Sequence, residues 1–150
     1  MAEVWFFHLD AQPLEHVLPR IVTSSLTRGW RLVIETAIPN RLAKISELLW
    51  SFEDVAFLPH GFEGEPNPER QPVWLTSTSE NPNNAQVRVL LDGAQPGDIS
   101  KLARAVLIFD GTDPEALENA RAAWKKQKAE GHDISYWKQD EGGKWINQAT

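Results

Sequence analysis

The sequence predicts an α/β protein of three layers, in which helices cover both faces of a mainly parallel sheet. Short apolar runs rich in aromatic and β-branched residues alternate with longer segments of helical periodicity, as they do in chains built from strand–helix–strand units. The runs are also nearly continuous, which is typical of strands buried on both faces. With 150 residues, the chain has the usual size of one domain.

The first half of the chain has the order strand, helix, strand, helix. Residues 4–9 form the first apolar run, and a helical pattern follows until Gly29 ends it. Pro19 lies inside this pattern and predicts either a kink or a later start of the helix. Residues 31–36 predict the second strand, and the apolar spacing of residues 42–50 predicts the second helix.

Proline and glycine accumulate over residues 51–72 and predict a long ordered loop after the second helix. Loops of this length in compact domains are often functional. Three further strands are expected at residues 73–76, 87–91 and 105–109, with a short helix around residues 99–102 before the last of them. The alternation of elements therefore predicts a Rossmann-like sheet.

The last helix has the clearest boundaries. Asp113 is placed to cap it, Pro114 occupies its first position, and Gly131 follows the lysines of its final turns. We expect residues 1–137 to form a single α/β domain. Residues 138–150 are expected either to form a hairpin at the sheet edge or to remain a partly mobile tail.

The composition excludes several classes of protein. There are no cysteines, so disulfides and thiolate metal sites are excluded. A net charge of -6, from 15 basic and 21 acidic residues, argues against a general binder of phosphate backbones. The chain has neither a signal-peptide pattern nor a run of about 18 apolar residues, so we expect a cytoplasmic protein. Seven tryptophans favour a binding protein.

Motifs for catalysis or cofactors are not found. The sequence contains neither a glycine-rich dinucleotide fingerprint nor a phosphate loop, and no serine stands in a Gly-x-Ser-x-Gly turn. The four histidines are scattered without metal-ligand spacing. We therefore expect no enzyme, no cofactor and no metal. The alternative hypothesis is a small nucleotide-binding protein or enzyme that uses the C-terminal edge of the sheet near Asp110.

The last helix carries one candidate binding surface. Its small residues, Ala116, Ala120 and Ala123, form a face that fits closely onto a sheet. An adjoining stripe holds an aromatic ring among cations and comprises Leu117, Arg121, Trp124, Lys125 and Lys128. This stripe suits an acidic peptide with an apolar end. Alternatively, the cations form a solvated helix end while Trp124 packs in the core, and the spacing leaves both interpretations open.

A second group of aromatic and apolar residues surrounds the start of the long loop. It comprises Trp50, Phe52, Phe57, Leu58, Pro59, His60 and Phe62. Such a cluster either plugs a small satellite core or forms an exposed docking patch. Sequence spacing alone favours the plug slightly.

Several short motifs, in order, resemble the family of the chi subunit of the bacterial DNA polymerase III holoenzyme. They are the aromatic strand ending at His8-Leu9, Leu49-Trp50, Phe57-Leu58-Pro59-His60-Gly61, the strand-to-helix passage from Leu107 to Gly111, Ala120-Arg121, Trp124-Lys125 and Gly131. The resemblance extends from the first strand to about Trp137. Each motif is weak alone, but their order and spacing are fairly specific.

The resemblance implies a non-catalytic adaptor that links the clamp loader to the acidic C-terminal tail of single-stranded DNA-binding protein. By position, Arg121, Trp124 and Lys125 match the tail-binding helix of the family, and Lys128 extends the same stripe. A second set matches the surface that meets the psi subunit, or a repair helicase in its place: Trp50, Phe57, Leu58, Pro59 and His60. Neither sequence-specific contact with nucleic acid nor contact with a membrane is implied.

Two departures from the family pattern are visible. Trp124 stands where the family has tyrosine or a similar aromatic residue, and the segment after Trp137 is longer than in the best-known members, which leaves Lys144-Trp145-Ile146 without an assigned role.

A third hypothesis is direct binding of single-stranded DNA by the basic aromatic helix. The overall acidity counts against it.

Overall fold

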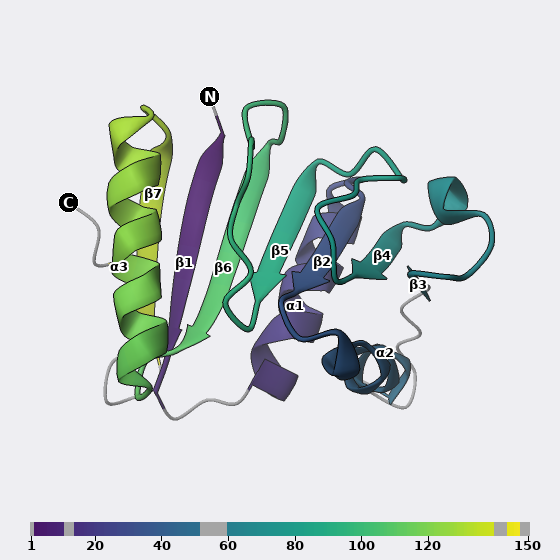
Figure 1. Cartoon of the computed structure of the whole chain (residues 1–150), viewed down its shortest axis with the longest axis horizontal. Coiled ribbons are helices and arrows are strands. Elements are labelled where there is room, and N and C mark those ends of the chain that lie inside the picture. Colours follow the sequence, from purple (N-terminus) through teal and green to yellow (C-terminus); the bar gives the residue numbers. More distant parts are fainter. Residues whose placement is uncertain (1, 11–13, 52–59, 140–143, 148–150) are drawn as a thin grey trace.

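The computed structural model describes residues 2–10, 14–51, 60–139 and 144–147, apart from a few side chains at their margins. In these residues, eight strands form one sheet in the order β3-β4-β2-β5-β6-β1-β7-β8. Every pair of neighbours is parallel except β7 with β8 (Figure 1). The strands are β1 (Glu3–Leu9), β2 (Leu32–Thr36), β3 (Gly61–Phe62), β4 (Val73–Thr76), β5 (Val87–Leu91), β6 (Arg104–Asp110), β7 (Asp133–Gln139) and β8 (Trp145–Asn147).

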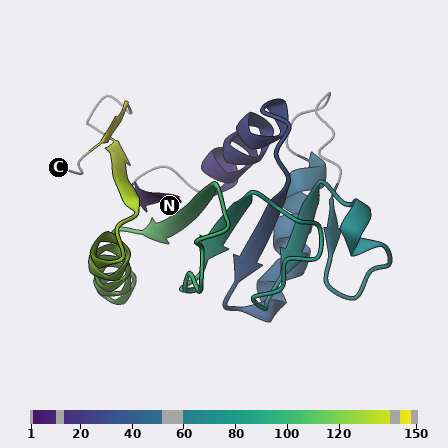
Figure 2. The same ribbon diagram turned by 90° about the horizontal axis from the view of Figure 1, so that it is seen from above.

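Helices lie on both sides of the sheet, as the sequence predicts. They are α1 (Leu14–Thr27), α2 (Leu42–Ser51) and α3 (Pro114–Ala129), with 3-10 turns η1 (Pro39–Arg41) and η2 (Pro68–Arg70). Figure 2 shows α1 and α3 on opposite sides of the strands. Apolar side chains of α1 and α2 join one buried cluster, and those of α3 join another. The predicted three-layer, Rossmann-like α/β fold is therefore confirmed.

The central strands place alternate side chains into the two clusters, because neighbouring residues of a strand point to opposite faces. In β1, Phe7 lies in the cluster under α1 and α2, whereas Val4 and Phe6 lie in the cluster under α3. In β6, Val106 lies in the cluster under α1 and α2, and Leu107 lies in the cluster under α3. Strands with two buried faces explain the continuous apolar runs of the sequence.

The helix α1 continues through Pro19 without interruption. It begins at Leu14, so the alternative of a start after the proline is wrong. Gly29, with φ of 79°, follows the helix in the left-handed conformation that favours glycine. The predicted end of this helix is thus confirmed.

Two sequence-based expectations are corrected. Residues 99–102 do not form a helix but a single turn, closed by the Leu102 N–H donating to the Ile99 carbonyl at 3.0 Å. Pro96 and Gly97 precede the turn, and the Asp98 carboxylate accepts the Ser100 N–H, a side-chain contact that competes with helix formation. The predicted loop of residues 51–72 contains the short strand β3 and the turn η2, although residues 52–59 lie outside the described part.

The face of the sheet that α3 leaves open is covered by the segment 77–86. Arg88, on β5, holds this segment: it donates to the carbonyls of Thr78 and Glu80, each at 2.8 Å. The same guanidinium donates to the Glu35 carboxylate from Nη2 at 2.6 Å and from Nε at 2.9 Å. Both side chains are largely buried, with exposed fractions of 8% for Arg88 and 13% for Glu35. The ion pair between β2 and β5 thus positions Arg88, which holds the segment that covers this half of the sheet in place of a helix.

At the sheet edge β7 and β8 pair as a hairpin, while the expected division of the chain at residue 137 stays a prediction. In this hairpin β8 runs antiparallel to β7, with Trp137 opposite Asn147. Trp145 packs edge-on against Phe7 with ring centroids 5.3 Å apart.

Among the residues that the structure describes, each helix is too short or too polar to traverse a bilayer.

Candidate functional site

The helix α3 begins and ends where the sequence predicts. Asp113 caps it, with Oδ1 accepting the Glu115 N–H at 3.0 Å. Gly131 follows with φ of 86°, a value that glycine adopts without steric cost. Local contacts therefore fix both ends of the helix. The packing of its inner face determines which side chains point toward solvent.

The inner face of α3 is built from small residues and one amide. Ala120 and Ala123 are buried against the sheet, as expected from their spacing. Gln127 is completely buried beside them, and neither of its side-chain polar atoms has a hydrogen-bond partner among the described residues. The alanines could be predicted from the pattern, and Gln127, four residues after Ala123, shares their face, but its polar side chain gives no reason to expect complete burial. The contacts of this face turn the cationic stripe outward.

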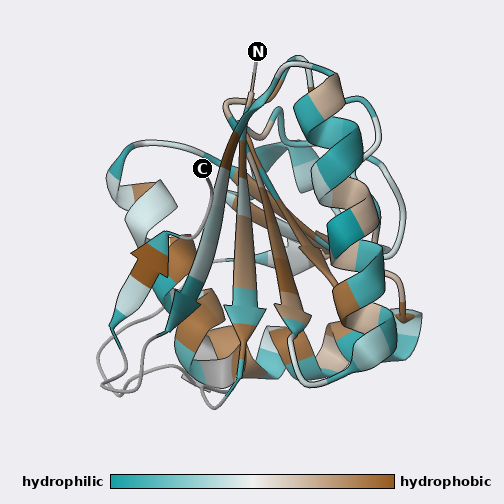
Figure 3. Cartoon of the chain, turned by 90° about the vertical axis from the view of Figure 1, so that its left-hand side faces the viewer, coloured by the Kyte–Doolittle hydropathy of each residue, from teal (hydrophilic) through white to brown (hydrophobic). Residues whose placement is uncertain are grey.

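The outer stripe of α3 has the composition that the sequence predicts. Arg121, Lys125 and Lys128 are exposed, whereas Trp124 is half-buried against the cluster beneath the helix. The Lys128 ammonium lies 4.6 Å from the centroid of the Trp124 ring, a cation–π distance. The side of α3 that faces away from the sheet is largely hydrophilic (Figure 3). One part of Trp124 therefore packs in the core, and the other part stays accessible to a ligand. Both interpretations of this residue from the sequence are thus partly met.

A hydrogen-bonded chain of side chains lies beside this stripe and was missed by sequence reasoning. His8 is buried, and its Nδ1 lies 2.8 Å from the Tyr136 hydroxyl while Nε2 lies 3.0 Å from the Asp10 carboxylate. Burial raises the pKa of Tyr136, and the positive charge of Arg121 opposes that rise. His8 lies on β1 and Tyr136 on β7, so the parallel pairing of these two strands brings the two side chains together.

The second predicted surface is described only in part. Trp50 lies in α2, but its side chain and the whole of Phe57, Leu58 and Pro59 fall outside the described residues. His60 is buried, and its Nε2 lies 2.8 Å from the Ser46 hydroxyl. It therefore anchors this part of the loop to α2. Phe62, on β3, is 37% exposed.

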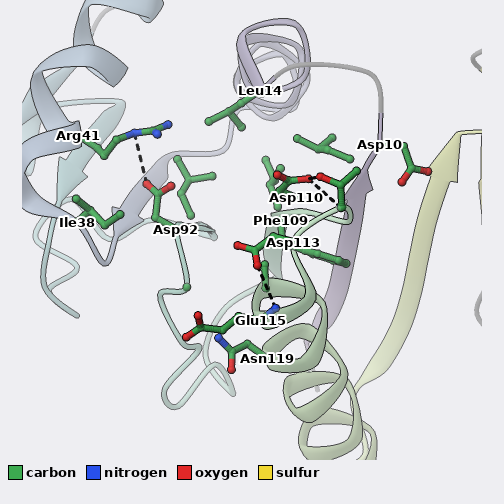
Figure 4. A pocket seen from close by; sticks show the side chains of 16 residues that line it. Asp10, Leu14, Ile38, Arg41, Asp92, Phe109, Asp110, Asp113, Glu115 and Asn119 are labelled. Carbon is green, nitrogen blue, oxygen red and sulfur yellow. Dashed lines mark hydrogen bonds and ion pairs between the residues drawn. The ribbon is translucent and has the colours of Figure 1, made fainter.

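A cavity of about 580 Å³ opens at the C-terminal edge of the sheet, where the alternative hypothesis places a site. It lies between the segments that follow β1, β5 and β6, a common location for ligands in open α/β sheets. Figure 4 shows its acidic side chains: Asp10, Asp92, Asp110, Asp113 and Glu115. Arg41 is the basic residue among those that line it, and its Nε lies 3.7 Å from Asp92. So many carboxylates would repel the phosphates of a nucleotide.

The aspartates of this cavity already hold the surrounding loops. Asp110 accepts hydrogen bonds from the Thr112 N–H and hydroxyl, which lower the pKa of its carboxyl group and keep it ionised. Asp113 caps α3, and Asp92 accepts the Thr36 hydroxyl at 2.6 Å. No group of three or more metal-ligating side chains occurs in the described ranges. These contacts give the carboxylates structural roles and weaken the hypothesis of an enzyme at this edge.

The fold and the surface of α3 define a small three-layer α/β protein with a basic aromatic helix end. The sequence profile of the family "DNA polymerase III chi subunit, HolC" matches residues 1–135, and the chain belongs to this family. The name of this family is that of a subunit of DNA polymerase III. The chain is also similar to the "Probable DNA polymerase III subunit chi" of Rickettsia prowazekii (strain Madrid E), with 28% identity over 102 residues. That similarity covers 68% of this chain and 60% of the relative.

Proposed function

We propose that this chain is a non-catalytic adaptor that links the polymerase III clamp loader to the acidic C-terminal tail of single-stranded DNA-binding protein. The tail-binding surface is formed by Arg121, Trp124, Lys125 and Lys128 of α3. The clamp-loader side, through a psi subunit or a repair helicase in its place, is met by Trp50 of α2 together with Phe57, Leu58, Pro59 and His60 of the segment that follows.

The observation that carries this proposal is the local charge of α3. The chain as a whole has a net charge of -6, yet Arg121, Lys125 and Lys128 stand exposed on one side of this helix. Within the described residues Arg121 and Lys125 make no hydrogen bond or ion pair, so their donors are available to carboxylates. Cations in the last turns are also favoured by the helix dipole, so their presence alone does not decide the function.

The half-buried Trp124 provides the second part of the binding surface. Its indole is held by packing on the cluster beneath α3, so little side-chain entropy is lost when a ligand covers the remaining face. An apolar side chain at the end of a peptide would cover that face, while its carboxylates meet Arg121 and Lys125. The combination selects an acidic chain with an apolar terminus over a nucleic acid strand, which carries phosphate at every unit.

The test of this proposal is a titration of the protein into a labelled peptide that copies the last residues of the host's single-stranded DNA-binding protein. We expect a dissociation constant of roughly micromolar order and weakening as salt is raised, because the contacts are exposed ion pairs. The matched control peptide lacks only its final apolar residue and should bind much more weakly. Equal binding of both peptides would mean simple charge attraction, and no binding of either would overturn the proposal.

A further inference from the structure

A second cavity, of about 230 Å³, lies on the opposite face of the sheet from α3. Its walls come from α1, from the strands β1 and β6, and from β8 of the C-terminal hairpin. Apolar and aromatic side chains make up most of the lining: Trp5, Phe7, Val17, Ile21, Val106 and Trp145. Trp145 lies beyond the residues that the chi family profile matches, so part of this cavity is built by the C-terminal extension.

Three basic side chains line the same cavity. His16 and Arg20 are exposed on α1, whereas Arg104, on β6, is only 6% exposed. No residue in the described lining is acidic. The cavity is therefore a basic, aromatic site in a protein of net negative charge.

The guanidinium of Arg104 is held in place but not fully satisfied. It stacks 3.7 Å from the centroid of the Trp5 ring and 5.1 Å from that of Trp30. Its Nε has no hydrogen-bond partner among the described residues. The nearest carboxylate, that of Glu3, lies 3.5 Å from Nη2, longer than the 2.7–2.9 Å of a charge-assisted hydrogen bond.

A buried cation that lacks some of its hydrogen-bond partners is stabilised when an anion binds beside it. Burial lowers the pKa of Arg104, because desolvation disfavours its charged form. The Nε and Nη2 donors form one edge of the guanidinium, and such an edge can hold two oxygens of a phosphate or carboxylate. The carboxylate of Glu3 opposes this lowering of the pKa, whereas the positive charge of Arg28 adds to it, so Glu3 offsets the charge of Arg104 only in part.

The size and walls of the cavity define the rest of the ligand. Its volume is below the range of about 300–1,000 Å³ that drug-sized ligands occupy, so it accommodates a single ring system. Trp5, Phe7 and Trp145 line the cavity, and bases stack on aromatic side chains regardless of sequence. An anionic group attached to the ring would then lie between the buried Arg104 and the exposed Arg20, which both line the cavity.

We propose that this cavity binds a nucleotide, with the base between α1 and Trp145 and the phosphate at Arg20 and Arg104. The same chemistry is offered by a free nucleotide and by one unit of a single-stranded DNA. The site is independent of the proposed tail-binding surface, because α3 lies on the other side of the sheet (Figure 2). It also gives a role to Trp145, for which the family resemblance provides none.

Calorimetric titrations with three probes test this proposal and distinguish the two sources. The probes are thymidine monophosphate, thymidine without phosphate, and a twelve-residue oligothymidylate, all at low salt. We expect thymidine to bind at least about tenfold more weakly than the tightest phosphate-bearing probe, because a hydrogen bond to a charged group contributes about that factor or more. Binding of the mononucleotide identifies a free nucleotide as ligand, whereas binding of the oligonucleotide alone identifies the strand.

Two substitutions in the lining and one control outside it place the binding in this cavity. Arg20→Gln should weaken binding of the phosphate-bearing probe about tenfold. Lys44→Gln, which removes a cation from α2, should leave that binding unchanged. Trp145→Ala should weaken it as well, because the base loses a stacking surface. The proposal is overturned if no phosphate-bearing probe binds, if Arg20→Gln and Lys44→Gln behave alike, or if Arg121→Ala abolishes the binding.

Discussion

Gly111→Ala is expected to lower the free energy of unfolding by about 3 kcal/mol or more. A methyl group at this position would overlap the imidazole of His8, so the ring must move. That ring is buried and lies within hydrogen-bond distance of both Asp10 and Tyr136, and displacing it breaks both contacts. The measurement is urea denaturation of the variant and the parent protein.

Gly97→Ala is the matched control, because a methyl group there meets no atom within 4 Å. It should change the free energy of unfolding by less than about 0.5 kcal/mol. The double variant His8→Ala with Gly111→Ala removes the overlap and should be less destabilised than the sum of the two single variants. A Gly111→Ala protein as stable as its parent would contradict the described position of His8.

Glu35→Ala is expected to lower the free energy of unfolding by about 3–5 kcal/mol, because it leaves the buried guanidinium of Arg88 without its carboxylate. Arg88 is 8% exposed and would keep only carbonyl partners, those of Thr78 and Glu80. The segment 77–86 should also become more susceptible to proteolysis, since Arg88 holds it against the sheet. Chemical denaturation and limited proteolysis measure the two effects.

The control for this substitution is Glu118→Ala, which removes an exposed carboxylate from α3. It should change stability by no more than about 0.5 kcal/mol. If Glu35→Ala is equally mild, the ion pair between β2 and β5 contributes little and segment 77–86 is held by other contacts.

The sequence predicts the fold well because local chemistry marks most elements. The apolar runs identify the central strands, and Asp113, Pro114 and Gly131 set both ends of α3. The short helix expected at residues 99–102 fails for a local reason as well, since its apolar spacing is outweighed by Pro96, Gly97 and the contact of Asp98 with Ser100.

The sites could be predicted less completely, because several of their contacts join distant parts of the chain. His8 and Tyr136 meet only through the pairing of β1 with β7, and no spacing in the sequence reveals it. The cavity at Arg104 likewise needs α1, β6 and β8 together. The stripe on α3 could be predicted because it lies on one helix, where an angular step of about 100° per residue fixes which side chains share a side.

The most direct measurement of the central claim compares tail-peptide binding by Arg121→Ala and by Lys44→Ala. We expect Arg121→Ala to weaken binding by about 1.5–3 kcal/mol and to leave the melting temperature unchanged, because Arg121 is exposed and makes no ion pair in the described residues. Lys44→Ala, on α2, should bind like the parent protein. Equal binding by the two variants would contradict the claim that α3 holds the tail, and a joint loss of stability and binding would make Arg121 a structural residue.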